Sequence, residues 1–209
     1  MRAGIAVADA GGPEALTMAA VARRLGPYSP MALYRYVGSR DGLIDLMLDA
    51  SAGEVSVPSA PGGDWREDLR RLAAETRRMA RRHLWFAQLF HTRPPLGPNL
   101  LRRTEFQLSV FAVQGATAEQ GMTYASMLDR YVLGDALQEA EEAGMRERYG
   151  LQAESAFLAE VAASHSLVER GGHPHLATWL RTPSAPSDEG FELGLTWLLD
   201  GLAGALGNP

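Results

Sequence analysis

Five side chains near the amino end of the chain could bind a nucleic acid: Thr17, Tyr34, Arg35, Tyr36 and Arg40. Hydroxyl and guanidinium groups donate hydrogen bonds to phosphate oxygens, and an arginine can also make a bidentate contact to guanine. Arg35 could do either, and both interpretations stay open. The two tyrosines contact DNA or cap a small hydrophobic core. The chemistry of these residues favours a DNA-binding surface.

The distribution of charge agrees with such a surface. The whole chain has a formal net charge of −5, and all 20 of its basic residues are arginine. Codon bias in a GC-rich genome explains the missing lysine better than a functional choice of arginine does. Residues 1–40 contain five arginines against Asp9 and Glu14, which is a net charge of 5 − 2 = +3. Because phosphate contacts are local, this basic end can bind DNA within an acidic protein.

Contact with DNA requires a short helix on the outside of a bundle, and the surrounding residues predict one. Thr17 is the expected N-cap of one helix and Gly26 its end. Ser29 then caps the next helix, which begins with Pro30 and ends near Val37. Two helices joined by a short turn that contains glycine have helix-turn-helix form, in which the second helix enters the major groove.

The rest of the chain also has helical spacing, and we find no alternating strand pattern. A stretch rich in Ser, Pro and Gly, residues 50–64, predicts a linker between a domain over residues 1–49 and a larger domain over residues 65–209. The sequence therefore predicts an all-α fold, with a small N-terminal helix-turn-helix bundle and a larger C-terminal helical domain. The other expected helices cover residues 2–10, 40–52, a long segment from Trp65, 99–114, 118–143, 153–170, 174–181 and 189–206.

Several function classes are excluded or disfavoured. The chain has no cysteine, which excludes disulfides, thiolate metal sites and cysteine nucleophiles. No apolar run approaches the ~20 residues needed to span a bilayer, so we expect a cytoplasmic protein with no membrane partner. His173 and His175, with His165 and Glu169 nearby, lack the spacing of a ligand set. We expect no metal, cofactor or enzyme activity; the alternative is an all-α ligand-binding protein or enzyme with a vestigial helix-turn-helix.

Three segments, LTMAAVARRLG, SPMALYRYV and SRDGLIDLM, resemble the N-terminal signature of the tetracycline-repressor family of transcriptional regulators over residues 3–49. A weaker resemblance continues through DWREDLRRLA, GPNLLRRTEFQL, YVLG and FELGLTWLLDGL. Membership implies a homodimer in which each N-terminal bundle reads half of a palindromic operator. It also implies a C-terminal domain that dimerises and binds a small-molecule inducer, most often in a repressor.

The turn GPYSPMALY is one residue longer than the usual spacing of the family, and Tyr28 is the extra side chain. Any of Tyr28, Ser29, Pro30, Met31 and Ala32 could therefore meet base edges. Met31 and Ala32 could contact thymine methyl groups, so that part of the specificity comes from apolar contact or from DNA shape.

Two further sets of residues follow from the resemblance to such a C-terminal domain. Small residues and leucines on the last helix fit a dimer seam, or they pack only within their own subunit: Gly194, Leu195, Leu198, Gly201, Leu202 and Ala205. Helix-borne aromatic and apolar residues could line an inducer pocket or form ordinary core: Met79, His83, Trp85, Phe86, Phe90, Phe106, Val110, Met127 and Tyr131. We expect the helix over residues 40–52 to transmit ligand binding to the DNA-reading helices.

Overall fold

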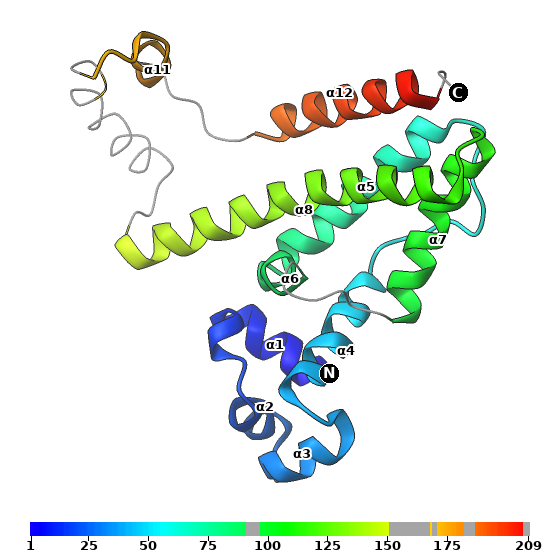
Figure 1. The fold of residues 1–209 in the computed structure, drawn as a ribbon. Coiled ribbons are helices and arrows are strands. Elements are labelled where there is room, and N and C mark those ends of the chain that lie inside the picture. The colour runs from blue at the N-terminus through cyan, green and yellow to red at the C-terminus, as the bar shows by residue number, and fades with distance from the viewer. Residues whose placement is uncertain (91–96, 151–167, 169–170, 182–186, 207–209) are drawn as a thin grey trace. The chain divides into compact units, whose positions relative to one another are not determined.

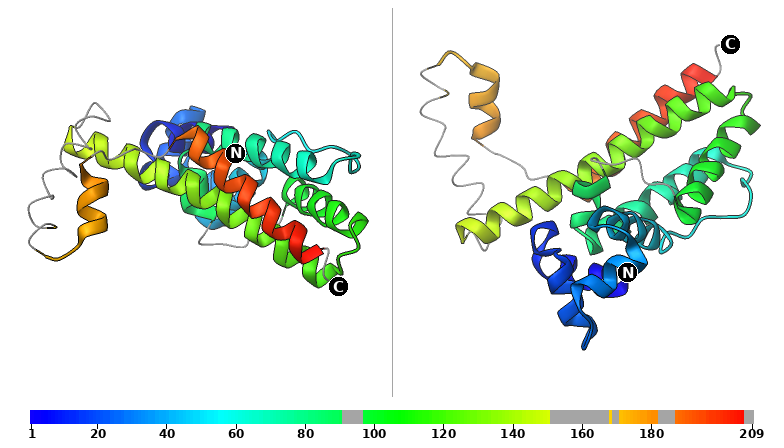
Figure 2. Two further views of the ribbon diagram at one scale, coloured as in Figure 1. Left: turned by 90° about the horizontal axis from the view of Figure 1, so that it is seen from above. Right: turned by 60° about the horizontal axis from the view of Figure 1, so that its bottom comes forward.

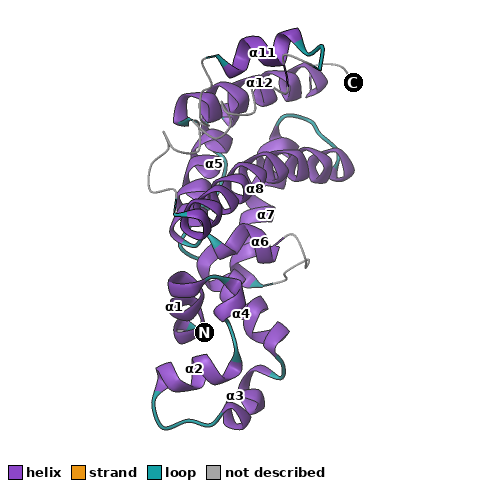
Figure 3. Cartoon of the chain, turned by 90° about the vertical axis from the view of Figure 1, so that its left-hand side faces the viewer, coloured by secondary structure: helices purple, strands orange, loops and turns teal. Residues whose placement is uncertain are grey.

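The computed structural model describes residues 1–90, 97–150, 168, 171–181 and 187–206. These residues form helices and turns, and no strand occurs among them, which confirms the all-α prediction (Figure 3). The helix predicted over residues 153–170 lies almost wholly outside the described residues. Clustering of contacts divides the chain into one compact unit, Met1–Ala140 with Trp197–Pro209, and a second, Glu141–Thr196. No described helix combines the length and apolar character that crossing a bilayer requires.

The N-terminal bundle contains α1 (Arg2–Gly11), α2 (Met18–Leu25), α3 (Pro30–Val37) and α4 (Arg40–Ala52), with a short 3-10 turn, η1 (Pro13–Ala15), between the first two (Figure 1). Helix α1 packs on α2 and α4, α2 packs on α3, and α3 packs on α4. The buried side chains of the bundle come mainly from the loop before α2, from α2 itself and from α4: Leu16, Met18, Val21, Leu43, Ile44, Met47 and Leu48.

Hydroxyl side chains begin three of these helices, and for Thr17 and Ser29 the sequence predicted it. Thr17 Oγ1 accepts a hydrogen bond from the Ala20 N–H at 3.1 Å, and Ser29 Oγ accepts one from the Ala32 N–H at 3.2 Å. Ser39 Oγ accepts from the Gly42 N–H at 2.9 Å. Each bond satisfies a donor that has no partner within the first turn of its helix. At Gly42 a Cβ atom would lie 2.2 Å from the Val37 carbonyl oxygen, so the turn between α3 and α4 needs glycine there.

The larger part of the first unit is built on α5 (Trp65–Arg82), α6 (Trp85–Phe90), α7 (Pro98–Val113) and the first part of α8 (Ala118–Tyr149). Asp64 caps α5 by accepting hydrogen bonds from the Arg66 and Glu67 N–H groups. Helix α5 contacts α6 and α7, and α4 contacts α5, α6 and α7. Figure 2 shows α5, α7 and the green first part of α8 close to one another.

The stretch predicted as a linker is partly built into the fold. Helix α4 continues to Ala52, and the Val55 side chain is buried. The Gly62 N–H donates a hydrogen bond to Asp68 Oδ2 at 2.5 Å, which holds the end of the stretch against α5. The division into domains at residues 50–64 stays a prediction. Near the carboxyl end, α11 (Pro174–Leu180) and α12 (Asp188–Leu206) agree with the predicted helices to within one residue.

Candidate functional site

Helix α3 presents its side chains outward. None of its residues is buried, and the exposed fractions are 73% for Met31, 41% for Tyr34 and 85% for Tyr36. Arg35 and the turn residue Tyr28 are also exposed. The expectation that the two tyrosines lie outside the core is therefore confirmed. Such a helix can reach base edges and phosphates without any change in the fold of the bundle.

Arg40 has a role within the bundle that the sequence did not predict. Its Nε donates to the Leu16 carbonyl oxygen at 2.9 Å, and its Nη2 donates to the Pro13 carbonyl oxygen at 3.1 Å. These bonds tie the start of α4 to the loop between η1 and α2. Because two of its nitrogens are held by backbone carbonyls, Arg40 fixes the start of α4, and its side chain is exposed, so that its contact with phosphate stays a prediction.

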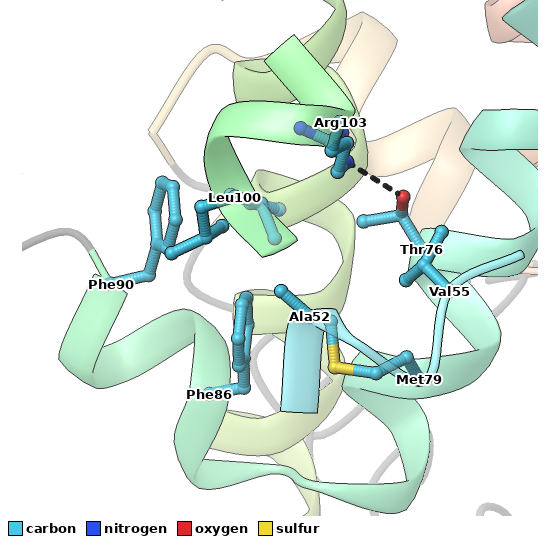
Figure 4. Close-up of a pocket in the computed structure, with 9 residues that line it drawn as sticks. Ala52, Val55, Thr76, Met79, Phe86, Phe90, Leu100 and Arg103 are labelled. Atoms are coloured by element: carbon cyan, nitrogen blue, oxygen red, sulfur yellow. Dashed lines mark hydrogen bonds between the residues drawn. The ribbon is translucent and has the colours of Figure 1, made fainter. Parts of the chain in front are cut away.

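A small cavity lies where α4, α5, α6, α7 and α8 meet (Figure 4). Its volume of about 10 Å³ is the room of roughly one water molecule. Most of its wall is apolar. The lining residues are Ala52, Val55, Thr76, Met79, Phe86, Phe90, Leu100, Arg103 and Leu133. A drug-sized ligand could enter only if these side chains moved apart.

The polar part of the cavity wall is made by Thr76 and Arg103, and Arg103 forms an ion pair with Asp129. Arg103 donates to Asp129 through Nη2 at 2.6 Å and through Nη1 at 2.9 Å, and its Nε donates to Thr76 Oγ1 at 3.2 Å. The Gln107 side-chain amide also donates to Asp129, at 2.9 Å. A bidentate arginine–carboxylate pair fixes both groups and satisfies them mutually.

Two partly buried carboxylates in this unit have pKa values shifted in opposite directions. Burial raises the pKa of the Asp129 carboxyl, but the charge and hydrogen bonds of Arg103, with the Gln107 bond, outweigh burial and hold the pKa below its ordinary value. Asp135 accepts from Arg77 Nε at 2.6 Å. Burial, helped by the nearby Glu139 charge, nevertheless raises the pKa of Asp135 above its ordinary value.

One attachment joins helix α4 to the start of α7. Asp49 Oδ1 accepts hydrogen bonds from the Asn99 N–H at 2.9 Å and the Leu100 N–H at 3.1 Å, and so caps α7. The Asn99 side-chain amide donates back to the Asp49 side chain and carbonyl. At Gly97 a Cβ would lie 2.2 Å from the Asp49 side chain, so this close approach needs glycine. Leu100, beside this cap, lines the cavity.

A second attachment joins α1 to the segment between α5 and α6. The buried His83 ring places Nδ1 2.8 Å from Asp9 Oδ1 and Nε2 3.1 Å from Glu54 Oε1. The Trp85 indole N–H also donates to Asp9 Oδ1, at 2.7 Å. Arg82 completes the cluster with an ion pair to Glu54 at 2.8 Å. Both ring nitrogens of the buried His83 therefore have hydrogen-bond partners, and the residue links the N-terminal bundle to the helices around the cavity.

Three of the nine predicted pocket residues line the cavity: Met79, Phe86 and Phe90. His83 and Trp85 bind Asp9 instead, while Phe106 and Val110 are buried but do not line it. Tyr131 is half-buried outside the lining, and Met127 is 43% exposed. In this part of α8 the buried side chains are Leu128 and Val132, not Met127.

The sequence patterns did not predict that Thr76 and Arg103 would form a polar part of the cavity wall. Arg103 lies between Leu100 and Phe106 at helical spacing, and all three side chains are buried. An arginine on the apolar face of a helix signals a buried charge that needs a partner. The partner, Asp129, is on another helix, so the signal existed but the pairing could not be predicted from it.

The last helix divides the residues predicted for a dimer seam. Leu195 and Leu202 are buried within the chain, as is Leu199, so the alternative that part of this stripe packs internally holds for them. Gly201 and Ala205 are exposed, and Gly194 and Leu198 are half-buried. Trp197, which sequence analysis overlooked, is 66% exposed on the side of the helix that carries Gly201.

The described residues contain no group of three metal-ligating side chains, and in this part of the chain His173 and His175 are exposed. His165 and Glu169 lie outside the described residues. What the described chain does combine is an outward helix after a tight turn and an apolar cavity whose walls include α4. The outward helix after the turn is the arrangement of a helix-turn-helix DNA-binding protein.

Comparison with known proteins agrees with this class. A family model described as "Tetracyclin repressor-like, C-terminal domain" matches residues 57–206. The HTH-type transcriptional repressor DrrR1 of Streptomyces coeruleorubidus is 34% identical over 97% of this chain and 75% of its own length. ActR of Streptomyces coelicolor without ligand is 28% identical, with a TM-score of 0.82 over 99% of this chain and 93% of that chain. ActR in complex with actinorhodin gives 29% identity and a TM-score of 0.81 over 98% and 95% of the two chains.

The chain belongs to the tetracycline-repressor family, and it is a DNA-binding transcriptional regulator. The resemblance seen in residues 3–49 is thereby confirmed. The alternative of a ligand-binding protein or enzyme with a vestigial helix-turn-helix is not favoured.

Proposed function

We propose that this regulator is a homodimeric repressor that binds a palindromic operator and releases it when a small molecule fills the cavity. The observation that carries the proposal is the position of Ala52, which lines the cavity at the end of α4. The same helix packs on α1 and α3. A ligand that pushes on Ala52 therefore pushes on the element that holds the DNA-reading helix.

DNA contact in this proposal comes from the exposed side chains of α3 and its preceding turn. The residues are Tyr28, Ser29, Pro30, Met31, Tyr34, Arg35 and Tyr36, with the N-terminus of α2 at Thr17 as a further phosphate contact. Arg40 holds the start of α4 to Leu16 and Pro13 ahead of α2, and its remaining N–H groups are a further phosphate contact in this proposal.

The ligand site in this proposal is the cavity in an expanded form. At about 10 Å³ the cavity admits no organic molecule, so binding must displace part of its wall. Phe86 and Phe90 are the side chains best placed to move, because they stack on each other in a six-residue helix, with ring centroids 5.5 Å apart. ActR, a similar protein, was solved with actinorhodin, which supports a small organic ligand here.

Two routes would carry the displacement to the bundle. Movement of α6 pulls on Asp9 of α1 through the Trp85 indole. Movement of α7 pulls on Asp49 of α4 through the capping bonds at Asn99 and Leu100. Two reading helices bind well only when their separation matches successive major grooves, about 34 Å apart. A ligand that binds the mismatched arrangement more tightly shifts the population away from the operator-bound state.

The dimer in this proposal forms through the exposed face of α12. Trp197 and Leu193 lie four residues apart on this face, and Gly201 and Ala205 continue it. At Gly201 and Gly204 a Cβ would meet no other atom within 4 Å in the chain, which leaves room for a close helix from a partner.

A mobility-shift assay with the promoter DNA beside the gene for this protein tests the proposal. We expect a saturable shift with the full chain and its loss with Tyr34→Ala, while circular dichroism shows an unchanged fold. Ala112→Leu, on the exposed part of α7, is the matched control and should keep the shift. Absence of a shift with the unaltered chain on any such fragment would overturn the repressor proposal.

A further inference from the structure

The cavity wall contains one charged side chain, Arg103, among the described residues that line it. Its guanidinium is buried and forms a bidentate pair with Asp129, whose two carboxylate oxygens both accept from it. The second polar lining residue, Thr76, accepts from Arg103 and donates its hydroxyl proton to the Leu72 carbonyl oxygen at 2.8 Å. The polar wall therefore carries no net charge, and its groups are already hydrogen-bonded.

We propose that the cavity selects a ligand that is uncharged where it meets Arg103, with a largely apolar body. This inference rests on the proposed function, because it concerns the same ligand site. It assigns the chemical class of the ligand and excludes carboxylates, sulfonates, phosphates and ammonium groups at the Arg103 wall.

The charge balance of the wall supports this class. An anion placed beside Arg103 loses its water but gains no unpaired positive charge, because Asp129 already neutralises the guanidinium. A cation meets no unpaired carboxylate, because Asp129 accepts from both Arg103 and Gln107. Burying an ion without a partner is strongly unfavourable, so charged ligands are rejected at this wall.

The number of available donors points the same way. A guanidinium has five N–H groups, and Arg103 uses one for Thr76, two for Asp129 and one for Gln107 at 3.4 Å. One N–H is left, which suits a single acceptor such as a carbonyl oxygen. The other seven lining residues are apolar. They match an apolar ring system and offer nothing to a charge.

Two fluorescent dyes test the inference on the full-length protein. N-phenylnaphthylamine is uncharged, and anilinonaphthalene sulfonate has the same two ring systems with an added sulfonate. We expect the uncharged dye to bind about tenfold or more tightly than the sulfonate, a difference of about 1.4 kcal/mol. Ala52→Leu, which extends a side chain into the cavity, should weaken binding of the uncharged dye. Ala112→Leu on the exposed part of α7 should not.

The variant Asp129→Asn leaves the Arg103 charge without its carboxylate and should move the preference at least about tenfold toward the sulfonate. Asp135→Asn is the matched control, since it removes a carboxylate from Arg77, which does not line the cavity. The ratio of its affinities for the two dyes should equal that of the unaltered chain. If circular dichroism shows that Asp129→Asn does not fold, the ratio of the two dye affinities in the unaltered chain still decides.

Equal or tighter binding of the sulfonate by the unaltered chain would overturn the inference. So would an unchanged ratio in folded Asp129→Asn, or binding of neither dye. The mobility-shift assay on the same preparation shows separately whether the proposed function stands. Operator binding without dye selectivity rejects only the ligand class, whereas loss of operator binding rejects the repressor itself.

Discussion

Helices α3 and α7 differ in what they bury. Helix α3 buries none of its side chains, while α7 buries six, among them Arg103 and Gln107. A substitution on α3 can alter contact with a partner and leave the fold intact. A substitution on the inner face of α7 changes the cavity and the stability together. We therefore expect mutation on α3 to change DNA affinity without changing stability, and mutation on the inner face of α7 to change ligand response and stability together.

The largest effect is expected at the buried ion pair. Arg103→Leu removes the partner of Asp129 and should lower the free energy of unfolding by about 3–5 kcal/mol, because a buried carboxylate is left uncompensated. Urea denaturation followed by circular dichroism measures it. The double variant Arg103→Leu with Asp129→Leu should recover much of the loss. A loss below about 1 kcal/mol for the single variant would show that water solvates the unpaired Asp129 carboxylate, so that it is not shielded in the fold.

The exposed face of α12 gives the next largest effect. Trp197→Arg should weaken the proposed dimer by about 2 kcal/mol or more, since large exposed aromatic residues dominate interface energies. Sedimentation velocity measures the dissociation, and operator affinity should fall with it. Val113→Arg, at another exposed apolar position, is the control and should stay dimeric. An unaltered sedimentation coefficient for Trp197→Arg would place the dimer seam elsewhere.

Arg35 on α3 is an exposed arginine, in contrast to the buried Arg103 on α7. Arg35→Ala should weaken operator binding by about 1–3 kcal/mol and change unfolding free energy by no more than about 0.5 kcal/mol. If Arg35 reads guanine, the loss concentrates on one base pair of the operator. If it binds phosphate, the affinity for all DNA sequences falls alike, and the slope of log affinity against log salt concentration falls by about one. Titrations at several salt concentrations separate the two, and an unchanged affinity would remove Arg35 from the interface.

The smallest effect concerns acid stability. The pKa of Asp129 is lowered in the fold, so its stabilisation is present above its unfolded pKa and is lost as pH falls through its folded pKa. The pKa of Asp135 is raised, so its contribution has the opposite sign and fades as pH rises through its folded pKa. Below about pH 4, Asp129→Asn should flatten the acid loss of stability. Above about pH 4, up to the raised folded pKa of Asp135, Asp135→Asn should steepen that loss. Urea titrations across this range decide, and equal slopes would contradict both assignments.

Local features of the fold could be predicted from the sequence. The caps at Thr17, Ser29 and Ser39 depend on a hydroxyl and a backbone N–H three residues away, so near neighbours determine them. The outward position of Tyr36 follows from the helical spacing of its neighbours on α3. Such contacts involve one helix, and helical periodicity describes a helix well.

Contacts between distant segments could not be predicted in this way. The Arg103–Asp129 pair joins two helices, and the His83–Asp9 contact joins residues 74 positions apart. Nothing in the spacing of either residue selects its partner. On α12 the apolar stripe was wide enough to serve two faces, and only the fold shows that Leu195 points inward while Trp197 is exposed. Periodicity identifies an apolar face but not what covers it.

The central claim is that filling the cavity changes the separation of the two reading helices. The chain has no cysteine, so Tyr36→Cys on α3 provides a single spin-label position. Pulsed electron–electron double resonance on the labelled dimer measures the distance between the two labels. The measurement is made with and without the cavity-filling substitution Ala52→Leu. The account predicts a shift of several ångströms together with a weaker operator complex. An unchanged distance beside a weakened complex, or labels with no intersubunit distance, would contradict it.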